Sequence, residues 1–166
     1  CMSMSKTYAM TGWRIGYAVG RVEIIKAMSK IQGQATSCAN SIGQAASIES
    51  LTGSQVEFEN MINKFKKRRD YMVKALKKIP EVSCPTPGGA FYAFPNFGYY
   101  IEKSFKEKTI SNSFDLCDLF LNEGHVATIP GDGFGAPGYV RFSYAIDEKT
   151  IDGGINRVRK IIDKIK

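Results

Sequence analysis

A lysine and an arginine near the start of the chain have the types and the spacing to bind one particular kind of ligand. Lys6 stands between two small hydroxyl residues, and Arg14 follows eight positions later beside the chain's single tryptophan. A neutral lysine amine forms Schiff bases with carbonyl compounds. An arginine guanidinium binds a phosphate group with two hydrogen bonds at once. Together the two side chains suit a ligand that carries both a carbonyl and a phosphate.

Pyridoxal phosphate is a cofactor that carries both groups, so the pair indicates a pyridoxal-phosphate site. The alternative is an ordinary surface loop in which both cations are solvated, and for an arbitrary pair this would be the better interpretation. The surrounding residues decide between the two. Residues 3–16 read Ser-Met-Ser-Lys-Thr-Tyr-Ala-Met-Thr-Gly-Trp-Arg-Ile-Gly.

This segment resembles the lysine signature of the class I aminotransferases, which are pyridoxal-phosphate enzymes of fold type I. The signature has Gly or Ser three positions before the lysine, a small residue directly before it, and a Gly-x-Arg-apolar-Gly ending. The residues that satisfy it are Ser3, Ser5, Lys6, Ala9, Met10, Gly12, Arg14, Ile15 and Gly16. The resemblance is closest to the bacterial aspartate aminotransferases. It implies that Lys6 is catalytic and holds the cofactor as an aldimine, and that Arg14 and Ser3 bind the cofactor's phosphate.

A second arginine, Arg141, stands in a mostly apolar, strand-like segment at 139–145. A guanidinium in such a strand is at least half buried, which is costly unless it meets an anion. From the residues alone, a structural ion pair and a ligand-binding arginine explain it equally well. The preceding segment, 126–135, also resembles the family and implies that Arg141 binds the substrate's α-carboxylate. The glycines of that segment fit turns, because their spacing is not Gly-x-Gly-x-x-Gly and no helix follows them.

The composition argues against several other classes of protein. The chain has 166 residues, of which 43% are apolar and 23% charged, as in an ordinary soluble domain. No apolar run approaches the roughly 20 residues that cross a bilayer. Four cysteines without Cys-x-x-Cys spacing and one histidine suggest neither a zinc site nor a disulfide framework. We therefore expect no metal and no membrane, and a cytoplasmic location with reduced thiols.

The net charge of +7 could indicate a nucleic-acid partner. The densest run of cations, at 64–69, falls within a helical apolar pattern, so we expect these charges to line the solvated face of a helix. Nucleic acid is not an expected partner. A positive balance also suits anionic cofactors and dicarboxylate substrates.

Hydrophobic periodicity and turn residues predict the elements. The predicted strands are 1–5, 14–19, 81–84, 90–94, 126–129 and 139–145, with the lysine in a loop at 6–12. The predicted helices are 22–32, 41–51, 54–79, 113–124 and a last one from Asp147. A capping box of Ser54 and Glu57 opens the long helix, and Gly124 is the expected stop of the next one. No shape is predicted for the insertion at 98–111.

The elements and the resemblance together predict an α/β protein of the type I pyridoxal-phosphate-dependent transferases, in three parts. Residues 1–53 are the C-terminal end of the large cofactor-binding domain, 54–79 are a long connecting helix, and 80–166 are a small α+β C-terminal domain. The resemblance covers only the C-terminal portion of the family's chains. The ring-stacking aromatic residue and the aspartate beside the pyridine nitrogen are therefore not found in this sequence.

The resemblance implies a pyridoxal-phosphate-dependent aminotransferase, homodimeric when complete. Its small-molecule substrates are expected to be an L-amino acid, aspartate first, and a 2-oxo acid such as 2-oxoglutarate. Other class I activities (aromatic, alanine or prephenate) are alternatives, and so is a non-catalytic, stand-alone interaction domain. Because the residues that tune the cofactor ring are missing, we predict that the 166-residue chain alone binds the cofactor weakly and does not transaminate.

Overall fold

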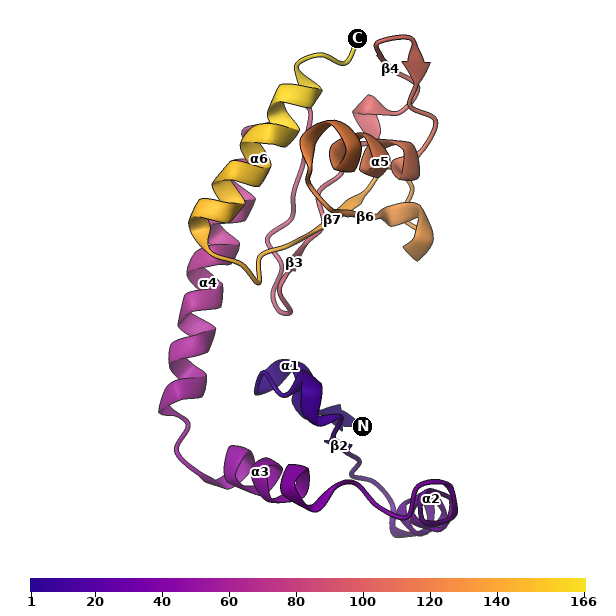
Figure 1. The fold of residues 1–166 in the computed structure, drawn as a ribbon, viewed down its shortest axis with the longest axis vertical. Helices are drawn as coiled ribbons and strands as arrows, with labels where there is room; N and C mark the ends of the chain where they lie inside the picture. The colour runs from indigo at the N-terminus through magenta and orange to yellow at the C-terminus, as the bar shows by residue number, and fades with distance from the viewer. The chain divides into compact units, whose positions relative to one another are not determined.

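The computed structural model describes all 166 residues, and the chain divides into two compact units, Cys1–Ile62 and Asn63–Lys166 (Figure 1). Helix α4 (Val56–Leu76) continues through the boundary between them. The predicted division at residues 53 and 80 therefore stays a prediction. None of the helices combines the length and the apolar character that crossing a membrane requires.

The first unit is mostly helical. Its elements are β1 (Met2–Ser3), α1 (Met4–Thr7), η1 (Thr11–Trp13), β2 (Gly16–Tyr17), α2 (Val22–Ala35), α3 (Ser41–Thr52) and the start of α4. Strands β1 and β2 pair antiparallel. The predicted start of α3 is confirmed, since the Asn40 side chain accepts a hydrogen bond from the Gly43 amide at 2.6 Å and so caps the helix.

Three predictions for this unit were wrong. Lys6 lies in the short helix α1 and not in a loop, because the Ser3 hydroxyl accepts a hydrogen bond from the Ser5 amide and so caps a helical turn. The strand expected at 14–19 is reduced to β2, since Arg14 has the left-handed φ of 52°, outside the range of a strand. Helix α2 also continues past Gly33, where we expected it to stop.

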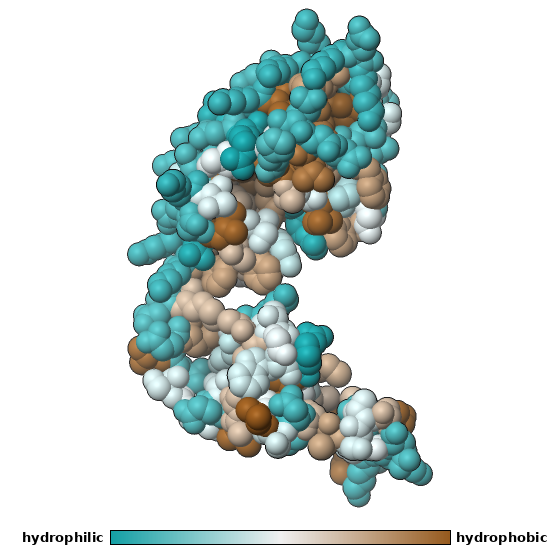
Figure 2. Space-filling view, in the orientation of Figure 1, coloured by the Kyte–Doolittle hydropathy of each residue, from teal (hydrophilic) through white to brown (hydrophobic).

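Most large apolar side chains of this unit lie at its surface (Figure 2). Its buried cluster consists of Met4, Met10 and Ile15. Helix α2 has no buried residue, and two members of its apolar stripe, Val22 and Ile31, are 58% and 70% exposed. Several large exposed apolar side chains on one helix are more than a scattered few, and such exposure is typical of a face that contacts other protein.

The second unit is the predicted α+β layer. Besides the rest of α4 it contains β3 (Tyr92–Ala93), η2 (Gly98–Tyr100), β4 (Ser104–Phe105), β5 (Lys108–Thr109), α5 (Ser113–Gly124), β6 (Ile129–Pro130), η3 (Gly131–Phe134), β7 (Val140–Ser143) and α6 (Glu148–Ile162). Strand β7 is central in an antiparallel sheet of order β3-β7-β6. The β4–β5 hairpin gives the 98–111 insertion its shape.

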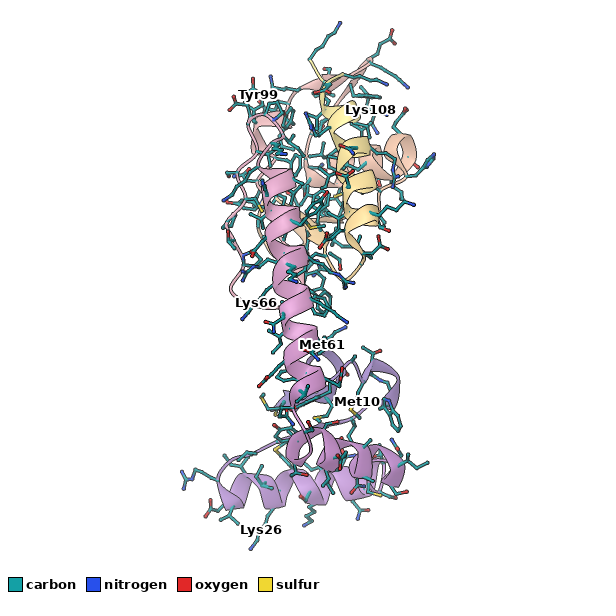
Figure 3. The ribbon with its side chains drawn as sticks, turned by 90° about the vertical axis from the view of Figure 1, so that its left-hand side faces the viewer. Met10, Lys26, Met61, Lys66, Tyr99 and Lys108 are labelled. Carbon is teal, nitrogen blue, oxygen red and sulfur yellow. The ribbon has the colours of Figure 1, made fainter.

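Helix α4 is shorter than predicted. The Ser54 hydroxyl accepts a hydrogen bond only from the Val56 amide, at 3.5 Å, so the expected capping box with Glu57 does not form. At the other end a tight turn follows Leu76 in place of another helical turn, with the Ile79 amide bonded to the Leu76 carbonyl at 3.0 Å. The lysines of the basic run are exposed along this helix, as predicted, whereas Arg68 and Arg69 are half-buried. Lys66 marks the position of the run in Figure 3.

One predicted strand and one predicted helix cap also differ from the structure. Residues 81–84 form one bridge, Ser83 to Asn96, and no strand, because the surrounding prolines cannot donate to a sheet. Helix α5 ends at Gly124, as predicted, but the left-handed cap residue is His125, with φ 51°, and not the glycine. Gly124 serves packing: a Cβ there would lie 2.7 Å from the Ile161 side chain of α6.

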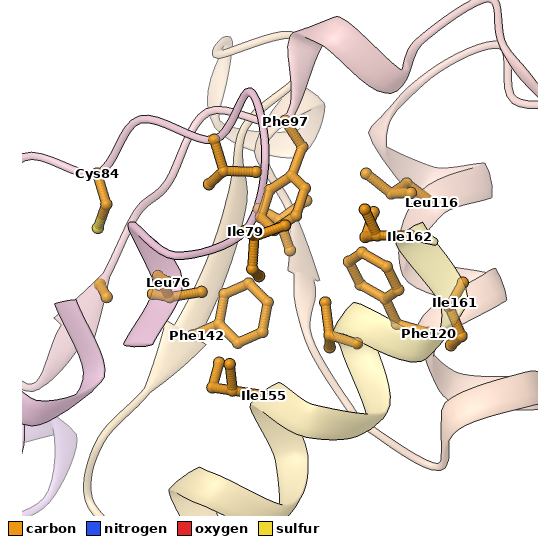
Figure 4. Packing of buried hydrophobic residues seen from close by; sticks show 14 of the residues in the cluster. Leu76, Ile79, Cys84, Phe97, Leu116, Phe120, Phe142, Ile155, Ile161 and Ile162 are labelled. Carbon is orange, nitrogen blue, oxygen red and sulfur yellow. The ribbon is translucent and has the colours of Figure 1, made fainter. Parts of the chain in front are cut away.

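The core of this unit forms where α4, α5 and α6 meet one face of the sheet (Figure 4). Phe97, Phe120 and Phe142 are in mutual ring contact there, with centroids 5.6 to 6.5 Å apart. Helix α6 contributes its predicted apolar stripe, of which the buried members are Ile151, Ile155, Val158 and Ile162. This core fixes the sheet that carries Arg141.

We predict that Phe120→Ala destabilises the second unit by about 3–5 kcal/mol, because Phe120 is 0% exposed and the ring leaves a cavity. Urea unfolding followed by circular dichroism measures the change. Phe114→Ala on the same helix is the matched control: this ring is 51% exposed, so its loss should cost less than about 0.5 kcal/mol. Equal destabilisation by the two variants would contradict the core described here.

Candidate functional site

Residues 3–16, the segment that carries Lys6, are held together at their two ends by backbone hydrogen bonds. The β1–β2 pairing places Ser3 opposite Gly16, and the Met4 amide donates to the Ile15 carbonyl at 3.2 Å. A Cβ at Gly16 would lie 2.5 Å from the Met2 carbonyl oxygen, so the two strands can approach this closely only because residue 16 is glycine. The closure holds Ser3, Lys6 and Arg14 in one short stretch of unit 1.

Ser3 and Lys6 lie in the first half of this segment. The Ser3 hydroxyl accepts its hydrogen bond from the Ser5 amide at 3.1 Å, which leaves its own O–H able to donate to another acceptor. Lys6 lies two residues later in α1, and its residue surface is exposed. A hydroxyl donor and an amine thus stand at the same helical turn.

Arg14 lies in the second half of the segment, where the backbone is strained. It has φ 52°, and Ala9 on the other side of η1 has φ 55°. Left-handed residues other than glycine cost roughly 1–3 kcal/mol and concentrate at functional sites. The exposed Arg14 guanidinium donates from Nη1 to the Thr11 carbonyl at 3.0 Å and forms no ion pair, so its other N–H donors can meet a ligand.

Asn40 is a residue whose second contact the sequence did not reveal. Besides capping α3 through Oδ1, it donates from Nδ2 to the Trp13 carbonyl at 3.2 Å. This bond ties the peptide just before Arg14 to the start of a helix. The only sequence signal for this second contact is that an asparagine cap, unlike a serine cap, keeps a spare amide donor.

The donor set of this segment fits pyridoxal phosphate. A hydroxyl and a guanidinium are suitable phosphate ligands, and an amine is the group that reacts with a carbonyl. The strained, closed backbone is a further sign of a binding segment. No group of three or more His, Cys, Asp or Glu side chains is arranged to hold a metal ion.

Arg141 belongs to unit 2 and lies on the outer face of its sheet. The neighbouring β7 residues Val140 and Phe142 point into the core and are 0% and 4% exposed, whereas Arg141 is half-buried. Its guanidinium carbon lies 4.4 Å from the centroid of the Tyr92 ring and 4.7 Å from that of Phe134. No carboxylate of the chain forms an ion pair with it.

The turn that carries Phe134 is fastened to α5 by a buried serine. The Asp132 carboxylate accepts hydrogen bonds from the Ser113 hydroxyl and from the Ser113 amide, the latter at 3.0 Å. The Ser113 Oγ in turn accepts from the Asp132 amide at 3.1 Å. These bonds to the charged carboxylate, first of all the one from the Ser113 hydroxyl, lower the pKa of Asp132 below 3.8.

Comparison with known proteins identifies the family of the chain. Residues 1–158 match the family model "Aminotransferase class I and II". The chain belongs to this family. The aspartate aminotransferase of Rhizobium meliloti strain 1021 is 42% identical over 163 residues, and the asparagine–oxo-acid transaminase of Streptococcus mutans is 44% identical over 161. These alignments cover 98% and 97% of this chain but 40% of each relative.

A solved aminotransferase structure agrees with the fold of the chain. The crystal structure of the aspartate aminotransferase from Rhizobium meliloti matches with a TM-score of 0.94 and 41% identity, over 98% of this chain and 41% of that one. The fold is thus that of the type I pyridoxal-phosphate enzymes, as predicted. The chain spans about two fifths of the length of the aminotransferases that it matches. The roles of Ser3, Lys6, Arg14 and Arg141 remain proposals.

We predict that Asn40→Asp loosens the lysine segment while leaving α3 capped. The carboxylate still accepts from the Gly43 amide, but it cannot donate to the Trp13 carbonyl and faces that oxygen with a negative charge. Because Trp13 is the chain's single tryptophan, acrylamide quenching of its fluorescence should increase. The matched control is Asn60→Asp, an exposed position of α4. Unchanged quenching in Asn40→Asp would show that the bond does not hold the segment.

We also predict a pH-dependent contribution of Asp132 to stability. Its folded-state pKa is lowered, so its contribution is fully present above the ordinary aspartate pKa and is lost as the pH falls below 3.8 and through the folded value. Wild type should therefore unfold at a higher urea concentration than Asp132→Asn at pH 7, and the difference should shrink as the pH is lowered from 4 to 3. A difference that stays constant over that range would contradict the ionised carboxylate as its source.

Proposed function

We propose that this chain is part of a pyridoxal-phosphate-dependent aminotransferase that moves an amino group from an L-amino acid to a 2-oxo acid. The observation that carries the proposal is the closed segment in which Ser3, Lys6 and Arg14 supply a hydroxyl, an amine and a guanidinium. Membership of the class I and II aminotransferases supports it. The activity is proposed for the complete enzyme, because the chain spans 40% of its relatives.

Each residue has a distinct role in this proposal. Arg14 and Ser3 hold the cofactor's phosphate, and Lys6 holds its carbonyl carbon. When bound, pyridoxal phosphate supplies a ring that stabilises negative charge at the substrate's α-carbon. The amine of Lys6, when the substrate's amino group takes its place on the cofactor, would move a proton to or from that carbon. Arg141 binds the substrate's α-carboxylate.

The substrates are proposed with aspartate as the amino-group donor and 2-oxoglutarate as the acceptor. The net charge of +7 suits such dicarboxylates. The relatives support a donor of this kind, but they include both an aspartate aminotransferase and an asparagine–oxo-acid transaminase. Aromatic, alanine and prephenate aminotransferase activities therefore stay alternatives. A substrate panel on the complete enzyme would distinguish them.

The assembly and the location of the complete enzyme are also proposals. We infer a cytoplasmic homodimer that works in amino-acid metabolism on small molecules, without a nucleic-acid or membrane partner. The exposed apolar side chains of α2 and α3 support an assembly in which further protein covers unit 1. Ile31 and Ile42, each 70% exposed, are the strongest examples.

The test is to find out which lysine the cofactor reacts with. The 166-residue chain is incubated with excess pyridoxal phosphate, treated with borohydride to fix the lysine–cofactor link as a stable amine, and mapped by peptide mass spectrometry. We expect labelling of Lys6 to exceed that of Lys26, an exposed lysine of α2 (Figure 3). The Lys6 label should fall several-fold when pyridoxal replaces pyridoxal phosphate, because Arg14 and Ser3 then lose their phosphate.

The controls separate a built site from general lysine reactivity. Lys6→Arg should remove the selective label, Arg14→Ala should remove the preference for the phosphorylated form, and Lys26→Arg should change neither. Without the ring-tuning residues we expect no transaminase turnover from this chain alone. Equal labelling of Lys6 and Lys26 with both compounds in the complete enzyme would overturn the proposed function.

A further inference from the structure

The outer face of the unit 2 sheet groups one cation with aromatic rings. The register pairs Tyr92 with Ser143 and Ile129 with Arg141. Tyr92 is therefore the diagonal neighbour of Arg141 on the same face, within reach of a long side chain. Phe134 approaches from η3, and its ring is 54% exposed. Strands and turn thus place two rings beside one guanidinium on a face that is not packed into the core.

The two rings contact the Arg141 guanidinium at the place where the carboxylate of an ion pair could otherwise lie. The guanidinium carbon of Arg141 is within 5 Å of both centroids, well inside the roughly 6 Å range of a cation–π interaction. A guanidinium is planar, and its N–H donors point outward in its own plane. Rings that contact the guanidinium fix its position without using those donors in hydrogen bonds. The donors then remain for a planar carboxylate.

The rings are themselves held in place. Tyr92 is half-buried and contacts the Phe91 ring with centroids 4.4 Å apart. Phe134 meets the Phe94 ring edge-on at 6.3 Å, and its turn is fastened by the Asp132–Ser113 bonds. An arginine side chain has many rotamers and loses their entropy when it is fixed. Neighbours that are fixed during folding remove part of that cost from the binding step.

We propose that Tyr92 and Phe134 are positioning residues that hold the Arg141 guanidinium ready for a ligand carboxylate. The proposal rests on the carboxylate-binding role proposed above for Arg141. The part that the rings play is steric and electrostatic, so a phenylalanine at position 92 can replace the tyrosine but an aliphatic residue cannot. The tyrosine hydroxyl forms no hydrogen bond in the chain and is not needed for this role.

The experiment titrates the chain with succinate and follows the Arg141 Nε–H resonance by NMR, assigned through its loss in Arg141→Lys. In wild type the resonance should be displaced by the ring currents and should move further as succinate binds. Tyr92→Leu and Phe134→Leu should each reduce the displacement and weaken succinate binding by about three- to tenfold. Tyr92→Phe should preserve both. Circular dichroism confirms that the variants are folded.

The matched control is Tyr99→Leu, which removes a 53% exposed tyrosine that contacts Lys103 at 4.3 Å and not Arg141. It should leave the Arg141 resonance and succinate binding unchanged. Wild-type affinity in folded Tyr92→Leu and Phe134→Leu, or no succinate binding at Arg141 in wild type, would overturn the proposal. Labelling at Lys6 tests the aminotransferase assignment independently, since none of these substitutions lies in unit 1.

Discussion

The alternation of side chains along β7 is the constraint on which the second unit depends. Val140 and Phe142 are buried in the core, and Arg141 between them faces away from it. A slip of one residue would place a guanidinium among phenylalanines and expose the core side chains. The pairing of Phe142 with Ala93 and of Arg141 with Ile129 fixes the register. The packing that stabilises the unit and the orientation of its candidate site are thus set together.

The first unit holds its candidate residues by different means. It buries Met4, Met10 and Ile15 only, so its order depends less on hydrophobic burial than on backbone contacts. The Met4–Ile15 hydrogen bond, the close approach at Gly16 and the Asn40 bridge close a segment that contains two left-handed residues. Such strain persists only where surrounding contacts over-determine the backbone. Each of these contacts therefore supports the position of Arg14.

The sequence predicted those features that depend on local pattern. The helix over 41–51, the helix from 113 and the apolar stripe of α6 follow from 3.6-residue periodicity and from caps within three residues. Ser3, Lys6 and Arg14, the proposed cofactor-binding residues, come from one contiguous motif, and their roles stay predictions. The strands were overestimated because their length depends on partners elsewhere in the chain. Lys6 was predicted in a loop, but the Ser3 cap outweighs the weak helical propensity of the segment and forms a helical turn there.

Contacts between distant residues could not be predicted from the sequence. The bond from Asn40 to Trp13 joins segments with no shared periodicity. The ring contacts of Arg141 depend on strand register and on a turn held by Ser113. Neither can be predicted from the local hydrophobic pattern of the sequence. A left-handed His125 also has little local signal, since glycine or asparagine is the usual residue there.

The structure changes the balance between the two explanations of Arg141 that the sequence left equal. A structural arginine in this unit is represented by Arg69, which donates to the Asp70 carboxylate at 2.8 Å and to the Pro87 carbonyl at 3.4 Å. Arg141 has no such partner, although it is half-buried and the chain has 16 acidic residues. Aromatic faces offset only part of the cost of removing a guanidinium from water. An anion that the chain itself does not supply would satisfy the remaining donors of Arg141, and this is why we propose it as a ligand-binding arginine.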